Sequence, residues 1–192
     1  GEKTAAHGEL ASCRGYRLRL DPPGANITIA AFSPAAVRAA GRCADRMLLN
    51  MVTPSSLAGL RAQLQHAAEK AGKATPGLAV WLPCAVDPQR ETIDQLKRAI
   101  VGYLAAPGYG EMMMAAGFTE LVKFARSRPH PKELLSAMPD ELIAAIGLLG
   151  DLKTIDAKVE EYRAAGADEI CMVPATAGDE LGERTLRAMQ EL

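Results

Sequence analysis

The sequence predicts an α/β fold in a single domain, built on a parallel β-sheet. The chain has 192 residues, enough for one domain. Near-continuous apolar runs alternate along it with helical patterns, and three predicted strands are followed at once by a helix-start signal. Strand–helix–strand units of this kind form parallel sheets covered on both sides. A doubly wound sheet and a (β/α) barrel both satisfy this order.

Four apolar runs are predicted to be buried strands, because they lack the polar alternation of a strand with one wet face. They are Ile27–Phe32, Met47–Val52, Leu78–Val86 and Glu169–Val173. Before them, we expect an irregular start with a β-hairpin near residues 8–20.

Helical patterns fill the segments between these strands. They are Pro34–Cys43, Pro54–Ala71, Pro88–Leu104 and Leu152–Ala165, with several shorter helices within residues 111–145. The insertion before the last strand is about two helical units long, and its Met112–Met114 triplet is expected to fill a core.

Three predicted strands are followed by the same kind of pair, a helix-capping residue and a proline: Ser33-Pro34, Thr53-Pro54 and Asp87-Pro88. Ser, Thr and Asp side chains accept a hydrogen bond from the first helical turn, and proline is well tolerated at the first helical position. Three helices are therefore predicted to begin at the carboxyl ends of strands. The segments "AAGRCADRMLLN" and "AAGADEICMVP" also repeat one helix-to-strand connection, and repetition of a unit favours the barrel over the open sheet.

Composition argues against several classes of function. The formal net charge is -1, with 22 basic and 23 acidic residues, so no long-range field attracts nucleic acid or anionic lipid. No apolar stretch reaches the roughly 18 residues that span a bilayer. We expect a cytoplasmic protein that acts on a small molecule, without nucleic-acid or membrane partners.

The cysteines and histidines show no metal-binding spacing. Three of the four cysteines lie in or beside apolar runs, which predicts buried thiols in a reducing compartment, and we expect no metal site. The cysteines are Cys13, Cys43, Cys84 and Cys171.

Polar residues at the predicted strand ends are the candidates for ligand binding. A helix that begins at the end of a buried parallel strand points free amides into the crevice where α/β proteins bind ligands, which places Ser33 where a phosphate is held. Asn50 ends the next strand, and the loop Pro174–Asp179 is a second possible phosphate cradle. Each has a purely structural alternative, with Ser33 a helix start and Asn50 a cap or loop contact. No catalytic nucleophile, acid pair or metal cluster is evident, so a cofactor is expected to carry the chemistry.

Three longer segments resemble the luciferase-like monooxygenase family of flavin and deazaflavin oxidoreductases, including its F420-dependent members. They are "ITIAAFSPAAVRAAGRCADRMLLNMVTP", "YLAAPGYGEMMMAAGF" and "VEEYRAAGADEICMVPAT". The resemblance implies the C-terminal half of a (β/α)8 TIM barrel, with four parallel strands and a helical insertion before the last. It also implies that residues 1–192 form an incomplete barrel domain that lacks the N-terminal strands.

The resemblance further implies a cofactor at the carboxyl ends of the strands: deazaflavin F420, or alternatively FMN. The positions that match those used around the cofactor's phosphate and tail are Ala31, Phe32, Ser33, Asn50 and Met51. Ser33 stands where the family usually has glycine, and so does Arg46 at the entrance of the second strand. The catalytic residues stay unassigned.

The function implied is hydride transfer between an organic substrate and F420, in an intact enzyme expected to be a homo-oligomer. An FMN-dependent monooxygenase of the same family is the alternative enzyme. A different class of function is a non-catalytic half-barrel that associates with itself or with a partner to cover its open sheet edges.

Overall fold

The computed structural model describes residues 2–17, 19–20 and 24–190. The strands are β1 (Thr4–His7), β2 (Ser12–Tyr16), β3 (Thr28–Ala30), β4 (Arg46–Asn50), β5 (Gly77–Val86), β6 (Leu148–Gly150) and β7 (Glu169–Pro174). The α-helices are α1 (Pro34–Cys43), α2 (Pro54–Lys70), α3 (Arg90–Ile100), α4 (Tyr109–Ala115), α5 (Thr119–Arg126), α6 (Pro131–Ala137), α7 (Asp140–Ile146), α8 (Leu152–Ala164) and α9 (Glu183–Met189). Short 3-10 turns occupy Val101–Tyr103 and Glu180–Gly182.

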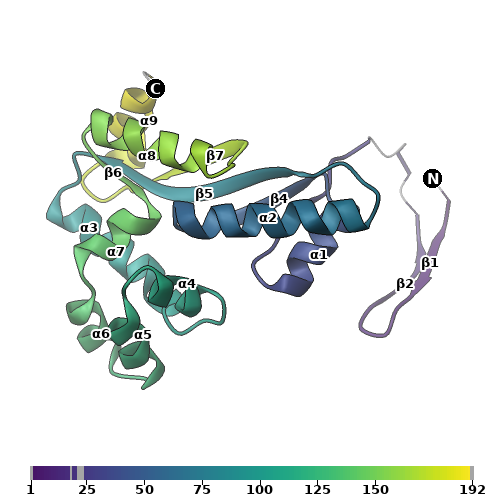
Figure 1. Cartoon of the computed structure of the whole chain (residues 1–192), viewed down its shortest axis with the longest axis horizontal. Coiled ribbons are helices and arrows are strands. Elements are labelled where there is room, and N and C mark those ends of the chain that lie inside the picture. The colour runs from purple at the N-terminus through teal and green to yellow at the C-terminus, as the bar shows by residue number, and fades with distance from the viewer. Residues whose placement is uncertain (1, 18, 21–23, 191–192) are drawn as a thin grey trace.

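The four predicted strands form a parallel sheet in the order β3-β4-β5-β7 (Figure 1). This confirms the predicted α/β fold with a parallel sheet. The short strand β6 was not predicted. It pairs with the carboxyl end of β5 at Cys84–Val86, and a strand of three residues is too short to show a periodic pattern.

The hairpin β1–β2 is also confirmed, although its strands begin earlier than expected. The two strands pair antiparallel around Gly8–Ala11, and every residue of β1 is exposed. Part of the predicted hairpin range, at residue 18, lies outside the described residues. Figure 1 shows the hairpin apart from the sheet.

The sheet has one covered face and one open face. In β4, Met47 and Leu49 are buried in the core shared with α1, α2 and α8, whereas the alternating residues Arg46, Leu48 and Asn50 are only partly covered. On β5, Trp81 is 48% exposed between buried neighbours. Because successive side chains of a strand point to opposite faces, helices cover one face and leave the other partly open.

The two repeated connections share one hydrogen-bonding geometry. Asp45 Oδ2 accepts from the Ile27 amide at 2.7 Å, and Asp168 Oδ2 accepts from the Leu78 amide at 2.8 Å. In each case the backbone N–H of the same aspartate donates to the carbonyl of the same neighbour. The predicted copies of one unit therefore join neighbouring strands at the amino end of the sheet in the same way.

Two of the three predicted helix starts are correct. Helices α1 and α2 begin at Pro34 and Pro54, but α3 begins at Arg90 rather than Pro88. The prediction for Asp87 was wrong because its amide donates to the Gly150 carbonyl at 2.8 Å, which extends the pairing with β6. Asp87 also has φ 46°, so helical geometry starts only beyond it.

The insertion between β5 and β7 forms the short helices α4–α7, as expected. It packs against the carboxyl ends of the strands through Met51, Ala85 and Ala175, in a second core of its own. Met112 and Met113 are buried there and Met114 packs against this core partly buried, so the expectation of a core role holds fully for two of the three.

The expectation of buried thiols holds for Cys84 alone among the four free cysteines, because Cys43 is exposed and the other two are half-buried. No helix within the described residues is long and apolar enough to cross a membrane.

Candidate functional site

Two helix starts meet at the carboxyl edge of β3 and β4. Ser33 Oγ accepts from the Ala36 amide at 3.3 Å, and Thr53 Oγ1 accepts from the Ser56 amide at 3.2 Å. Because β3 and β4 are adjacent and parallel, the first turns of α1 and α2 lie at the same edge of the sheet. First turns leave backbone N–H groups without intrahelical partners, so both helices present donors and positive dipole ends there.

A cavity of about 450 Å³ opens between these two first turns and the segment that leads into α4. Its lining combines polar groups with small residues and an aromatic ring. The residues that line it are Phe32, Ser33, Pro34, Ser56, Gly59, Leu60, Gln63, Pro107, Gly108, Glu111 and Met112.

Two hydroxyls in this cavity have protons available for a ligand. Ser33 Oγ accepts a hydrogen bond from the Ala36 amide. Ser56 Oγ accepts a hydrogen bond from the Thr53 hydroxyl at 3.0 Å. A hydroxyl that accepts within the protein can still donate its own proton. The cavity thus offers hydroxyl donors beside two helix N-termini, a set that suits a phosphate.

One carboxylate, that of Glu111, also lines the cavity. It forms an ion pair with Arg126 and accepts from the Gly108 amide at 2.6 Å. Arg126, and then the backbone amides of Glu111 and Gly108, hold the pKa of Glu111 below its ordinary value. Because this negative charge is already paired, it opposes an anion in the cavity less than a free carboxylate would.

An aromatic cluster borders the cavity. Tyr109 stacks on Phe32 with ring centroids 4.8 Å apart and meets Tyr103 edge-on at 4.8 Å. Asn50 Nδ2 donates to Tyr109 Oη at 3.4 Å. Burial raises the pKa of Tyr109, which stays a neutral phenol at neutral pH.

Glycine is required just before Tyr109. Gly108 has φ 86°, and a Cβ there would lie 2.8 Å from the Phe32 ring. The close approach of the chain to Phe32 explains why a Gly-Tyr pair begins α4 at this place.

The predicted site residues divide into two groups. Phe32 and Ser33 line the cavity, and Asn50 joins them through Tyr109. Ala31 and Met51 are buried in the two cores beneath the edge and do not line the cavity. Met51 has φ 50°, a conformation that bulky residues rarely adopt outside functional sites.

Sequence reasoning missed Ser56 and Tyr109. Ser56 stands three residues after the capping Thr53, where a capping residue binds an amide, and this spacing is a usable signal. Tyr109 lies within the segment "YLAAPGYGEMMMAAGF", which resembles the family. Nothing local indicates that it meets Asn50, which lies 59 positions away.

In the loop Pro174–Asp179, the possible second phosphate cradle, two of the backbone amides are bound within the protein. Gln95 Oε1 accepts from the Thr176 amide at 3.0 Å and from the Ala177 amide at 2.9 Å. These amides already have a partner within the protein. Among the residues described, no three His, Cys, Asp or Glu side chains gather as metal ligands would.

Comparisons with solved structures agree with this architecture. An F420-dependent secondary alcohol dehydrogenase, solved with an F420-acetone adduct, aligns with a TM-score of 0.70 and 16% identity over 94% of this chain and 52% of its own. The coenzyme F420-dependent tetrahydromethanopterin reductase of Methanopyrus kandleri aligns with a TM-score of 0.66 and 18% identity over 82% of this chain and 49% of its own.

An FMN complex is among the similar structures as well. The oxygenating constituent of 3,6-diketocamphane monooxygenase from Pseudomonas putida aligns with a TM-score of 0.52 and 16% identity, over 93% of this chain and 53% of its own. The chain thus spans about half the length of the structures it matches. At these identities the likeness shows the fold. A comparison with curated protein sequences gave no match.

The sequence itself matches a family model. The model of the luciferase-like monooxygenase family aligns with residues 1–169, which include β3, β4, β5, the helical insertion and the edge described above. The chain therefore belongs to the luciferase-like monooxygenase family.

Proposed function

We propose that this chain forms the phosphate-binding part of a barrel oxidoreductase that transfers hydride between a small organic substrate and deazaflavin F420. The observation that carries the proposal is the cavity where two helix N-termini and two hydroxyls converge beside Phe32. Helix N-termini with free donors are anion sites in many nucleotide-binding proteins. Pockets of a few hundred Å³ accommodate cofactor fragments.

Each residue of the edge has a separate role in this proposal. Ser33 and Ser56 donate hydrogen bonds to the phosphate, and Phe32 gives the adjoining part of the cofactor an apolar surface. Asn50 positions Tyr109, which closes the cavity on one side. When bound, the deazaflavin accepts or donates the hydride, while the protein supplies orientation and excludes water.

Ala31 and Met51 act on the backbone rather than by direct contact. Both are buried next to residues of the edge, Ala31 beside Phe32 and Met51 beside Asn50, and Met51 has a positive φ in the turn from β4 toward α2. We propose that they fix the positions of the two helix starts.

F420 is preferred to FMN in this proposal, although both occur among the similar structures. The two F420-dependent proteins align with TM-scores of 0.70 and 0.66, against 0.59 for a riboflavin lyase solved with modified FMN and 0.52 for the FMN complex. We also propose that the intact enzyme is a homo-oligomer.

Titration of the full-length chain with F420 and with FMN tests the proposal, with affinities read from cofactor fluorescence. Two substitutions at Ser33 separate binding from folding. Ser33→Asp keeps a good N-cap but places a negative charge against the phosphate, so affinity should fall at least about tenfold. Ser33→Gly keeps an acceptable cap and should bind within about threefold of the wild type.

Ser136→Ala is the matched control, because its hydroxyl only donates to the Lys132 carbonyl on α6. It should leave the affinity unchanged. Failure of both cofactors to bind, or equal binding by Ser33→Asp and the wild type, would contradict the proposal.

A second candidate function is the non-catalytic half-barrel that associates through its open face. The exposure of Trp81 at 48% and of Val173 at 49% on neighbouring strands favours it. Apolar residues left open on a sheet face often mark an association surface.

A further inference from the structure

A second groove lies outside the sheet, between helices α1 and α2. Its volume is about 420 Å³, and its floor is formed by Val37 and Ala67, which are buried. The two helices cross closely because Gly41 has no side chain: a Cβ there would lie 2.6 Å from that of Ala67. Because the helices cross closely, the rows of side chains that they turn outward form the two walls of one narrow groove.

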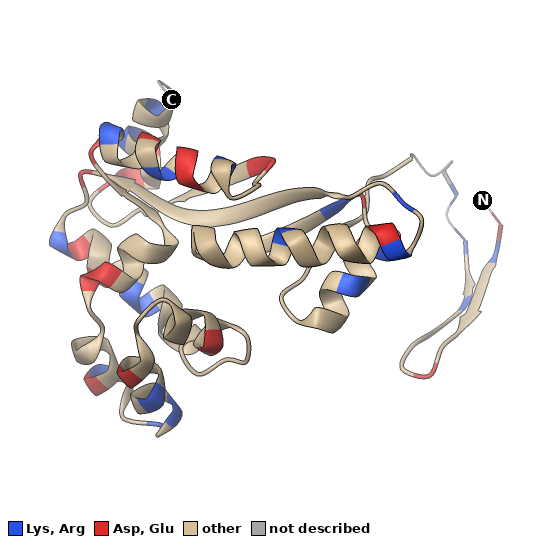
Figure 2. Cartoon of the chain, in the orientation of Figure 1, with Lys and Arg blue, Asp and Glu red and all other residues tan. Residues whose placement is uncertain are grey.

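The walls of this groove carry basic side chains from both helices. Arg38 and Arg42 come from α1, and His66 and Lys70 come from α2. No Asp or Glu lines the groove, and within the described part of the chain no ion pair to these four side chains is found. Figure 2 shows a basic segment on α1 and, at the nearby end of α2, a basic and an acidic segment side by side. That α2 carboxylate, Glu69, is exposed outside the groove.

The groove continues from the phosphate cavity. Pro34 and Gln63 line both the groove and the cavity. The basic groove therefore begins at the cavity beside the first turns of α1 and α2. From Pro34 to Arg42 the helix rises about 12 Å, at ~1.5 Å per residue. An extended chain of α-linked residues needs about three or four residues for that length, at ~3.3–3.6 Å each, and a γ-linked chain, whose residues have two more backbone bonds, needs about two.

We propose that this groove binds the oligoglutamyl chain that F420 carries beyond its phosphate. The inference rests on the proposed function. FMN ends at its phosphate, whereas F420 continues into a flexible chain with one carboxylate per residue. Carboxylates at intervals along that chain would pair with Arg38, Arg42 and Lys70, and the methylene groups would lie on Val37 and Ala67. The groove would thereby favour F420 over FMN.

Other polyanions fit the groove less well. Proteins that bind single-stranded nucleic acid usually stack bases on aromatic side chains as well as contacting phosphates, and the groove lining contains no Phe, Tyr or Trp. A single small anion would use one or two of the cations and leave the rest of the groove unfilled. A short acidic chain that starts at the phosphate cavity matches both the length and the charge.

The test uses fluorescein-labelled tetra-γ-glutamate, which contains no deazaflavin, and the full-length chain. We expect saturable binding by fluorescence anisotropy that weakens as salt increases. The double variant Arg38→Gln/Arg42→Gln should weaken binding about five- to tenfold, since each exposed charge pair contributes modestly. The control Lys123→Gln/Lys132→Gln removes the same charge from α5 and α6 and should change binding less than about twofold.

Two results would overturn the inference: equal losses in both double variants, or equally effective displacement of the probe by a short oligonucleotide of the same charge. A parallel titration with F420 from which the glutamates have been removed distinguishes failure of this inference from failure of the proposed function. Binding of that core to wild type and to Arg38→Gln/Arg42→Gln alike, with no binding of the tetraglutamate, contradicts the groove alone. Failure of the core to bind contradicts the proposed function.

Discussion

At the scale of single residues, the edge of the sheet depends on small groups with defined hydrogen-bond partners. Ser33 both caps α1 and faces the cavity, where glycine is usual in the family. Glycine would let a phosphate approach the backbone more closely, whereas serine contributes a donor of its own. The Ser33 substitutions proposed above therefore also measure which of the two contributes more to affinity.

Tyr162 is the largest side chain in the core and joins α8 to the chain after β4. It is 0% exposed, and its hydroxyl donates to the Val52 carbonyl at 2.7 Å. Burial raises the pKa of Tyr162, so the phenol stays protonated and keeps this hydrogen bond across the physiological range.

Tyr162→Phe should lower the free energy of unfolding by about 1–3 kcal/mol, because the buried Val52 carbonyl loses its partner. Tyr16→Phe, on the exposed strand β2, is the control and should change it by less than about 0.5 kcal/mol. Urea unfolding followed by circular dichroism measures both. Equal effects of the two substitutions would show that the Val52 hydrogen bond contributes nothing net.

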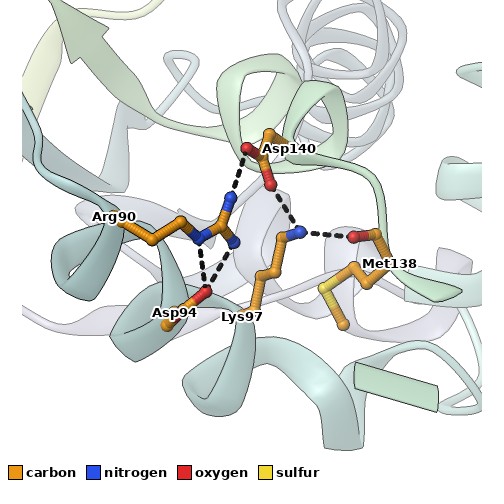
Figure 3. A network of polar contacts seen from close by, with 5 residues as sticks. All are labelled: Arg90, Asp94, Lys97, Met138 and Asp140. Carbon is orange, nitrogen blue, oxygen red and sulfur yellow. Dashed lines mark hydrogen bonds and ion pairs between the residues drawn. The ribbon is translucent and has the colours of Figure 1, made fainter. Parts of the chain in front are cut away.

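At the scale of elements, an ionic network fixes the helical insertion to α3. Lys97 has a side chain only 10% exposed and pairs with Asp140 at 2.5 Å, while its ammonium also donates to the Met138 carbonyl (Figure 3). Arg90 joins Asp140 at 2.8 Å and also binds Asp94 within α3. Asp140 thus connects the start of α7 to two cations of α3.

Asp140→Asn should lower the free energy of unfolding at neutral pH, because it leaves the nearly buried Lys97 without its counter-ion. Asp94→Asn is the matched control: among the residues that the structure describes it forms one ion pair, the exposed one with Arg90 in the same helix, and it should have a smaller effect. Urea unfolding of both variants at pH 7 measures the difference. An equal or larger effect of Asp94→Asn would show that the network does not hold the insertion.

The same pair predicts an acid dependence. Lys97 first, and then Arg90, hold the pKa of Asp140 below its ordinary value. A folded pKa below the unfolded value of about 4 means that this stabilisation is present above pH 4 and is lost as the pH falls through the folded pKa. The difference between the wild type and Asp140→Asn should therefore shrink between pH 5 and about pH 2, as followed by urea unfolding.

At the scale of the whole molecule, the sheet has one face that helices do not cover and two edges whose strands pair on one side only. β3 and β7 each pair on one side only among the described strands, and Trp81 and Val173 are about half-exposed on neighbouring strands. Unpaired edges and exposed apolar side chains both favour association. We expect the chain by itself to self-associate through this face.

Sedimentation and fluorescence together test that expectation. Trp81 is the single tryptophan, so its emission should shift to the blue as concentration rises and the face is covered. Val173→Lys should weaken association by placing a charge on the face. Leu186→Lys, at a comparably exposed position on α9, should not. A wild-type chain that stays monomeric at every concentration would contradict self-association.

The sequence by itself determined the elements whose signals are local. Apolar runs marked β3, β4, β5 and β7, and Ser-Pro and Thr-Pro pairs marked the starts of α1 and α2 to the residue. Each signal depends on side chains within one turn or one strand, and such contacts form wherever the sequence permits them. Phe32 and Ser33 could be placed in the site for the same reason: they directly follow a recognisable strand.

Only the tertiary structure decided the features that depend on packing between distant segments. Asp87 is kept out of α3 by pairing with Gly150, and Tyr109 reaches Asn50 across 59 positions. Arg38 and Lys70 share a groove because Gly41 lets two helices cross closely. Those contacts form only when the crossover helices pack on the sheet, and that arrangement is set by the fit of whole surfaces rather than by any short pattern of residues.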